Sequence, residues 1–287
     1  MRIAHAETTP KEPVCALRGG KIEFQTLLEG TENTIDNYHV LLADTDISFK
    51  SPRHRHNFEQ IRYSLVEATN IGKGRNLEIG DVGYFPEGTY YGPQNQEETG
   101  KTSLNMVIQF AGPSGSGFMS QRQFTQAFED MQALGRFEGG VFRRNVPLPD
   151  GRINQDAYEA VWETVNGRKL TYAKPRYLDP VHVREEAYAW VPLADAAGVA
   201  FKHIGTFNER GVAVYFLQLQ PGARYRLAKL PQSRVVFFKD GTGRVGKHDH
   251  WTKWTAMHTS PGETPELVAT TLTEALVLHL PRFDDLA

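Results

Sequence analysis

The sequence of 287 residues has little of several features that would narrow its class. Its single cysteine, Cys15, excludes an internal disulfide, which fits a reducing compartment and predicts a cytoplasmic protein. Cys15 lies two residues after Pro13 in a leader where no periodic element would position it, so we do not expect it to be a nucleophile. No apolar run approaches the ~20 residues of a membrane-spanning helix. The N-terminal MRIAHAETTPKEPVC also lacks the apolar stretch of a secretory signal or a membrane anchor.

An excess of charge of one sign is also missing. The chain has 32 Lys and Arg against 34 Asp and Glu, a formal net charge of -2 with the ten histidines neutral. Nucleic-acid-binding domains usually carry a strong basic bias, so we expect neither a nucleic acid nor a membrane as partner, but a small-molecule ligand. The small-residue stretch AGPSGSGFMS (111–120) lacks the Gly-Lys-Ser/Thr ending of a phosphate-binding loop.

The segments that are present read as strands, then helices, then strands again. Short β-rich runs with glycine-containing turns between them are typical of a sandwich or a barrel. NIGKGRN (70–76) is such a turn. The clearest strand candidates are YHVLLADTDISF (38–49), QIRYSLVEA (60–68), GDVGYFP (80–86), SLNMVIQF (103–110), GVAVYFLQL (211–219), SRVVFFKDG (233–241) and TEALVLHLP (273–281).

The middle of the chain predicts helices. Ser120 is placed to cap a first helix, whose apolar positions recur at helical spacing and predict a face packed on a barrel: Phe124, Ala127, Phe128, Met131 and Leu134. A second helix is expected from near Asn154, with a common apolar face made by Tyr158, Val161, Trp162 and Val165.

Two segments carry a recognisable motif. HRHNFEQ (54–60) contains His54 and His56, with Gly72 or Gly74 later in the chain. GDVGYFPEGTYYGPQN (80–95) has the spacing Gly-x5-Pro-x-Gly-x2-Tyr-x3-Asn, set by Gly80, Pro86, Gly88, Tyr91 and Asn95. Together these segments resemble the paired signatures of the cupin superfamily, in which the position of Tyr91 is a histidine.

The resemblance covers residues 54–95 and implies a jelly-roll-like barrel. The strand rhythm of the C-terminal half is similar to a second cupin barrel without signature histidines. We therefore expect a mostly β bicupin: an N-terminal barrel over 1–119 that carries the site, a short helical connecting segment over 120–170, and a degenerate barrel over 171–287. Many cupins pair through strand edges, so the resemblance also implies a homodimer.

A strand places alternate side chains on one face. His54, His56 and Gln60 are then in phase, whereas Glu59 points the other way unless a bulge intervenes. The resemblance implies a single transition metal ion, and the candidate ligands are His54, His56, Gln60 and Tyr91. Imidazole suits Fe, Mn, Ni, Cu and Zn without selecting one. The neutral amide of Gln60 is a weaker ligand than the usual carboxylate, and Tyr91 would have to bind as phenolate.

Two more residues are substrate-binding candidates. Arg62 shares the predicted inner face and has the planar fork that suits a carboxylate. Gln109 alternates with Asn105 and Val107 on a later strand, where one of the two polar side chains is expected to line the cavity. With Arg62 inside the barrel, the expected substrate is a small oxygen-rich or anionic molecule.

Three functions follow, and the sequence leaves open whether the protein is an enzyme. Family precedent favours a metal-dependent, dioxygenase-like oxidoreductase, with the metal on His54 and His56. The alternatives are a metal-free isomerase, epimerase or lyase, with His54 or His56 as base and Tyr91 as acid, and a ligand-binding protein without catalysis. A second His-x-His pair, His248 and His250, falls in a turn and is expected to be exposed.

Overall fold

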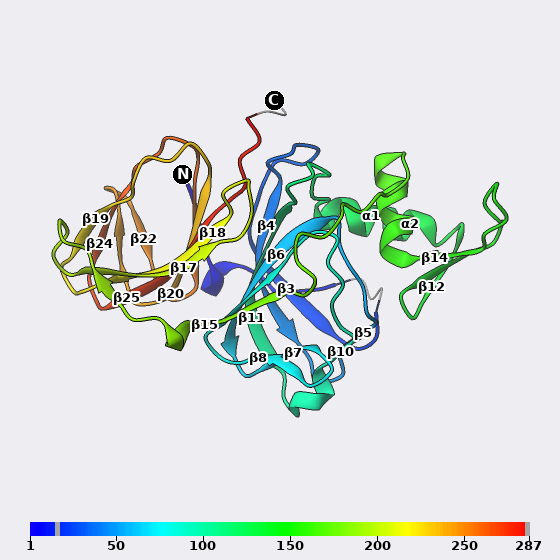
Figure 1. Ribbon diagram of the computed structural model, residues 1–287, viewed down its shortest axis with the longest axis horizontal. Helices are drawn as coiled ribbons and strands as arrows, with labels where there is room; N and C mark the ends of the chain where they lie inside the picture. Colours follow the sequence, from blue (N-terminus) through cyan, green and yellow to red (C-terminus); the bar gives the residue numbers. More distant parts are fainter. Residues whose placement is uncertain (15–17, 285–287) are drawn as a thin grey trace. The chain divides into compact units, whose positions relative to one another are not determined.

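The computed structural model describes residues 1–14 and 18–284, so Cys15 lies outside the described residues. It is mostly β, as the sequence predicted, with two α-helices among the described elements (Figure 1). In that part of the chain no helix is both long and apolar enough to cross a membrane.

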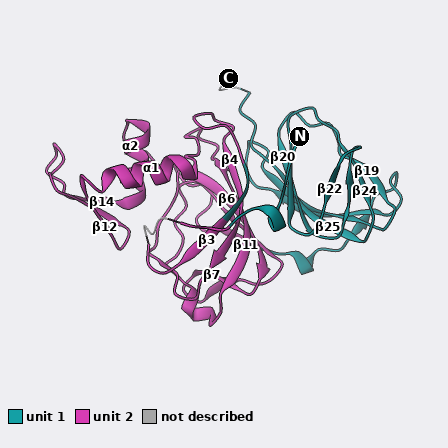
Figure 2. Cartoon of the chain, turned by 180° about the vertical axis from the view of Figure 1, so that it is seen from behind, with its two compact units in different colours: residues 1–10, 25–28, 183–287 teal, residues 11–24, 29–182 magenta. Residues whose placement is uncertain are grey.

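The chain divides into two compact units (Figure 2). One unit comprises residues 1–10, 25–28 and 183–287, and the other comprises residues 11–24 and 29–182. Residues 1–10 belong to the same unit as residues 183–287, because β1 (Arg2–His5) pairs antiparallel with β23 (Thr255–Thr259).

The larger unit is built on a seven-stranded sheet that runs, in order, β15 (Val181–Arg184), β9 (Asp81–Phe85), β6 (Phe58–Val66), β11 (Ser103–Ala111), β4 (Tyr38–Thr45), β3 (Ile22–Glu29) and β2 (Glu12–Pro13). Two short pairs accompany it, β5 (Lys50–Ser51) with β10 (Gln94–Asn95) and β7 (Thr69–Gly72) with β8 (Arg75–Leu77). The turn of the second pair contains Gly74 at a positive φ of 63°, as the turn motif predicted.

The other unit has a second seven-stranded sheet, in the order β1, β23, β20 (Arg234–Asp240), β25 (Thr273–His279), β18 (Ala213–Leu219), β17 (Val199–Thr206) and β16 (Val191–Pro192). A four-stranded sheet runs β19 (Arg224–Arg226), β24 (Glu266–Ala269), β21 (Gly243–Val245) and β22 (Asp249–Trp251).

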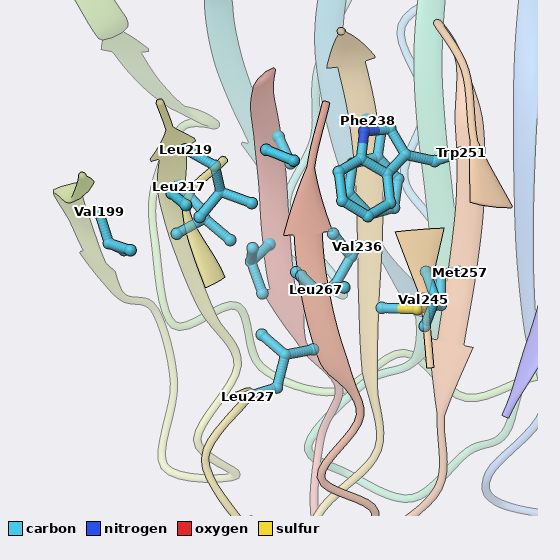
Figure 3. Close-up of a cluster of buried hydrophobic side chains, with 14 of the residues drawn as sticks. Val199, Leu217, Leu219, Leu227, Val236, Phe238, Val245, Trp251, Met257 and Leu267 are labelled. Atoms are coloured by element: carbon cyan, nitrogen blue, oxygen red, sulfur yellow. The ribbon is translucent and has the colours of Figure 1, made fainter. Parts of the chain in front are cut away.

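Apolar side chains from both sheets of this unit fill the space inside it. Trp251 and Phe238 are fully buried, and their rings stack with centroids 4.5 Å apart (Figure 3). Leu217, Val236 and Leu267 extend the same cluster. A barrel packed in this way has a core where a ligand cavity would otherwise lie.

The helical segment contains more than helices. Helix α1 (Gln121–Met131) begins at Ser120, whose side chain accepts a hydrogen bond from the backbone of Gln123 in a capping box. Helix α2 (Ala157–Asn166) follows three strands that the sequence did not predict, β12 (Gly135–Glu138), β13 (Val141–Arg144) and β14 (Asn154–Asp156). Three short 3-10 turns complete the description: Ala6–Thr8, Gln96–Thr99 and Glu185–Ala187.

The expected packing of the first helix was partly wrong. Its buried face, with Ala127 and Met131, packs on Val161 and Trp162 of α2 and on Phe142 of β13. The helices and the small sheet thus share a core of their own. Leu134 lies beyond the end of α1 and is 55% exposed, because the helix stops at Met131.

Candidate functional site

A cavity of about 710 Å³ opens inside the larger unit. Its lining comes from the inner face of the large sheet, from the short strands β7 and β10, and from α1 and α2. All six candidates from the sequence line it together: His54, His56, Gln60, Arg62, Tyr91 and Gln109. Asn105 lines it as well, so both polar side chains of β11 face the same space.

The alternation argument assumed that His54 and His56 lie on a regular strand. They lie before it, because β6 begins only at Phe58. Instead His54 forms an isolated antiparallel bridge with Tyr91, through backbone hydrogen bonds of 3.0 and 2.9 Å. The bridge sets the two side chains next to each other, with ring centroids 4.3 Å apart. The ring of His56 lies 4.9 Å from that of His54 and stacks on Phe58.

Strand β6 directs its even-numbered residues into the cavity. Phe58, Gln60 and Arg62 line it, whereas Glu59 is buried elsewhere and accepts a hydrogen bond of 2.6 Å from Tyr84. A neutral amide, not a carboxylate, therefore faces the histidines.

Arg18 is the cavity residue that the sequence did not reveal. Its Nη1 lies 2.7 Å from Nε2 of His54, and the same nitrogen also donates to Ser51. A guanidinium can only donate, so Nε2 of His54 is the acceptor. The other ring nitrogen then carries the proton and donates to the backbone oxygen of Pro52 at 2.8 Å.

A second guanidinium fixes the rest of the network. Nε of Arg62 donates to Oε1 of Gln60 at 3.0 Å, so the amide nitrogen of Gln60 faces Nδ1 of His56 at 2.9 Å. Nδ1 of His56 therefore accepts, and its proton sits on Nε2. Another nitrogen of Arg62 donates to the hydroxyl of Tyr91 at 3.0 Å, and its guanidinium stacks over the ring of Phe85 at 4.4 Å.

Both imidazoles of the site are neutral at physiological pH. Burial, together with the nearby cation Arg18, lowers the pKa of His54 well below its usual value. Burial also lowers the pKa of His56, and the neighbouring His54 and Arg18 add to the effect. Arg18 keeps its charge, since arginine starts from so high a pKa, although burial lowers the pKa of Arg18 as well.

The formal charge of the cavity centre is therefore positive. Within residues 1–14 and 18–284 neither Arg18 nor Arg62 forms an ion pair with a carboxylate. Asn105 adds an unused acceptor, because its buried Oδ1 has no hydrogen-bond partner while its amide nitrogen donates to Thr69.

This donor set does not fit a metal ion. A metal on Nε2 of His54 would stand ~2.1 Å from it, along the direction in which the guanidinium nitrogen of Arg18 already lies at 2.7 Å. Gln60 uses both ends of its amide, and the Tyr91 hydroxyl is held by a cation. In the described part of the chain, no group of three His, Cys, Asp or Glu side chains could hold a metal.

The helices contribute side chains from the apolar faces that the sequence predicted. Phe124 of α1 and Tyr158 of α2 line the cavity, as do Phe118 and Met119 just before α1. Tyr158 is held there by a hydrogen bond of 2.8 Å from its hydroxyl to Asn57.

The remaining histidines stay outside this site. His248 and His250 are exposed, as predicted, and the ring of His250 stacks on that of His5 within the unit that holds the second sheet. His279 ends β25, and burial lowers the pKa of His279 to about 4.

The comparisons with known proteins rest on structure alone. No family model matches the sequence, and no curated protein gives a significant sequence match. Among solved structures, a provisionally named dioxygenase from Nostoc punctiforme aligns over 100% of this chain and 84% of its own, with a TM-score of 0.61 and 10% identity. A provisionally named glyoxylate-induced protein from Pseudomonas aeruginosa covers 99% and 90%, with a TM-score of 0.62 and 11% identity.

A third similar structure is a glutamate-to-alanine mutant of the oxalate decarboxylase from Bacillus subtilis. It matches over 99% of this chain and 78% of its own, with a TM-score of 0.56 and 13% identity. Another structure of that enzyme concerns its Mn(II) centres. Identities this low carry the fold and not the activity. Matches over the whole chain, with two units built on antiparallel sheets, show that this chain has the bicupin fold, as its two motifs and the strand rhythm of its C-terminal half predicted.

Proposed function

We propose that the N-terminal barrel binds a small organic anion, in the form of a carboxylate, without a transition metal. One observation carries this proposal: two guanidiniums, Arg18 and Arg62, enter a large cavity, and the hydrogen-bond partners that hold them there are neutral. Arginine presents a planar fork that matches a carboxylate with two parallel hydrogen bonds. An anion would supply the negative charge that the cavity centre lacks.

Binding of carboxylates to arginine variants tests this proposal. A panel of small carboxylates is titrated calorimetrically into the wild-type protein and into Arg18→Gln and Arg62→Gln. Hydrogen bonds to charged groups contribute about 1.5–3 kcal/mol each, so each variant should bind at least about tenfold more weakly. Arg143→Gln removes an exposed arginine of β13 outside the cavity and should bind like wild type. If no carboxylate binds, or if the three variants behave alike, the proposal fails.

A metal-dependent, dioxygenase-like activity is the competing function. Its support is the fold shared with the Nostoc protein and with the oxalate decarboxylase. The contact of Arg18 with His54 speaks against it, because it uses the lone pair that a metal would need. Metal analysis of protein purified without a polyhistidine tag separates the two. A full equivalent of metal that disappears in His54→Ala would favour the oxidoreductase.

Acid–base catalysis on the bound anion is a second candidate, favoured by the adjacent rings of His54 and Tyr91. The Tyr91 hydroxyl accepts from Arg62 and keeps its own proton to donate, while His54 is a neutral imidazole. Once a turned-over ligand is known, Tyr91→Phe should lower turnover by about a hundredfold or more. Unchanged turnover with unchanged binding would exclude Tyr91 as the acid.

A further inference from the structure

Part of the cavity wall formed by β3, β4 and β11 is apolar. Leu41 and Ala43 of β4 and Val107 of β11 form one hydrophobic cluster, against which Ile22 and Phe24 of β3 pack. All five of these residues also line the cavity. Because Val107 pairs in register with Leu41, the two side chains stand side by side on the inner face of the sheet. The cluster is thus a continuous apolar surface that faces the open space.

Apart from Asn105 and Gln109 of β11, the polar groups described above come from other elements. Gln60 and Arg62 come from β6, His54 and His56 from the segment before it, and Tyr91 from the partner of that segment. In register, Arg62 lies beside Val107, and Leu41 lies beyond Val107 on the next strand. The inner face therefore changes from cationic to apolar within the width of three strands.

The end of the cavity beside the helices is apolar and aromatic as well. Phe118, Met119 and Phe124 line it there, and the ring of Phe118 packs edge-on against that of Phe58, with centroids 5.1 Å apart. A two-carbon dianion would leave most of the 710 Å³ empty of ligand and would place nothing on this surface. Cavities of this size instead suit ligands with a sizeable apolar body and a few fixed polar contacts.

We infer that the ligand is an amphipathic monocarboxylate. Its carboxylate binds to Arg18 and Arg62, and its hydrocarbon or aryl body lies on the Leu41–Ala43–Val107 wall and extends toward Phe118 and Phe124. This inference deepens the proposed anion binding and rests on it. Unlike anion binding alone, the amphipathic ligand predicts that affinity grows with the apolar length of the ligand.

A homologous series of ligands tests the inference. Acetate, butanoate, hexanoate and octanoate are titrated calorimetrically into the wild-type protein, and hexanedioate is compared with hexanoate. Burial of each added methylene should tighten binding about three- to fourfold. Hexanoate should bind more tightly than hexanedioate, whose second carboxylate would meet the apolar wall. A flat series, or tighter binding of the diacid, overturns the amphipathic ligand while anion binding itself stands. No binding by any member overturns the proposed function instead.

A pair of valine substitutions locates the apolar body. Val107→Thr puts a hydroxyl on the wall with little change in volume and should weaken octanoate about threefold or more, and acetate by a much smaller factor. Val40→Thr makes the same change on β4, where Val40 points to the other face of the sheet and does not line the cavity. It should leave both ligands unaffected. Equal effects of the two substitutions on octanoate would contradict the placement.

Discussion

If Arg18 excludes a metal from His54, removing it should open the site to metal ions. The perturbation is the double variant Arg18→Ala with Gln60→Glu, which frees Nε2 of His54 and supplies the carboxylate that Gln60 replaces. The site centre then changes from two fixed cations, Arg18 and Arg62, to one cation and one anion, so its formal charge falls from about +2 to about 0. We expect the double variant to bind about one equivalent of Mn²⁺ or Co²⁺.

The magnitude follows from distance and charge. With Arg18 in place, a metal bound to Nε2 of His54 would lie within roughly 0.6 Å of the guanidinium nitrogen, since a metal–nitrogen bond is about 2.1 Å and that nitrogen stands at 2.7 Å. Even if the guanidinium moved about 4 Å away, its repulsion of a divalent ion would be about 8 kcal/mol at an effective dielectric constant near 20. That equals the whole binding free energy of a micromolar site.

The assay measures metal per chain after loading and gel filtration, with the visible absorption of Co²⁺ as a second readout. Wild type and the single variant Gln60→Glu should retain less than about a tenth of an equivalent, because Arg18 is still present. His54→Ala in the double-variant background should abolish binding, and Arg143→Ala with Gln60→Glu serves as the matched control. A folded double variant without metal would refute the reasoning, as would stoichiometric metal in wild type held through His54.

Three further predictions concern stability. Trp251→Ala should lower the free energy of unfolding by about 3–5 kcal/mol, because the fully buried ring stacks on Phe238; denaturant melts measure this, and carboxylate binding should persist in the folded protein. Glu87→Gln should cost about 3 kcal/mol in the same melts, since the buried carboxylate of Glu87 accepts from Arg176 at 2.9 Å and from Ser114, and a neutral amide would weaken these charge-assisted hydrogen bonds. Burial lowers the pKa of His39 to about 4, so below about pH 6.5 the unfolded chain binds a proton there that the folded protein does not. The free energy of unfolding should therefore fall by about 3 kcal/mol between about pH 6.5 and about pH 4. His39→Gln should make the free energy of unfolding less dependent on pH in this range, and an unchanged dependence would contradict the role given to His39.

The sequence predicted the fold well because the fold depends on local patterns. Apolar runs and glycine turns located the main strands, and the spacing from Gly80 to Asn95 identified the barrel type. Ser120 began its helix as its side chain chemistry predicts. The three strands between α1 and α2 were missed because they are short and polar, and Phe142 alone among their side chains is fully buried at 0% exposure.

The candidate site was predicted as a set of residues but not as a network. Alternation placed Gln60 and Arg62 in the cavity, because a strand obliges every second side chain to share a face. It gave no information on which atoms the amide of Gln60 would meet. The amide of Gln60 contacts Arg62 on the same strand and His56 before the strand, and these two contacts fix which ring nitrogen of His56 carries its proton. The small molecule, the homodimer and the cytoplasmic location stay predictions.

Arg18 shows why the metal prediction and the structure diverge. Motif matching weighs residues at fixed spacings, and Arg18 stands outside both motifs, in a leader with no periodic pattern. Its position depends on long-range contacts: Ser51 and His54, which it contacts, lie 33 and 36 residues along the chain. The departures at Gln60 and Tyr91 were visible in the sequence, and each gains a reason in the structure, because both side chains accept hydrogen bonds from Arg62. A carboxylate at position 60 would neutralise that guanidinium from within the protein. The amide and the phenol instead hold it in place while leaving its charge to a ligand, so the same substitutions that weaken a metal site complete the anion site that we propose.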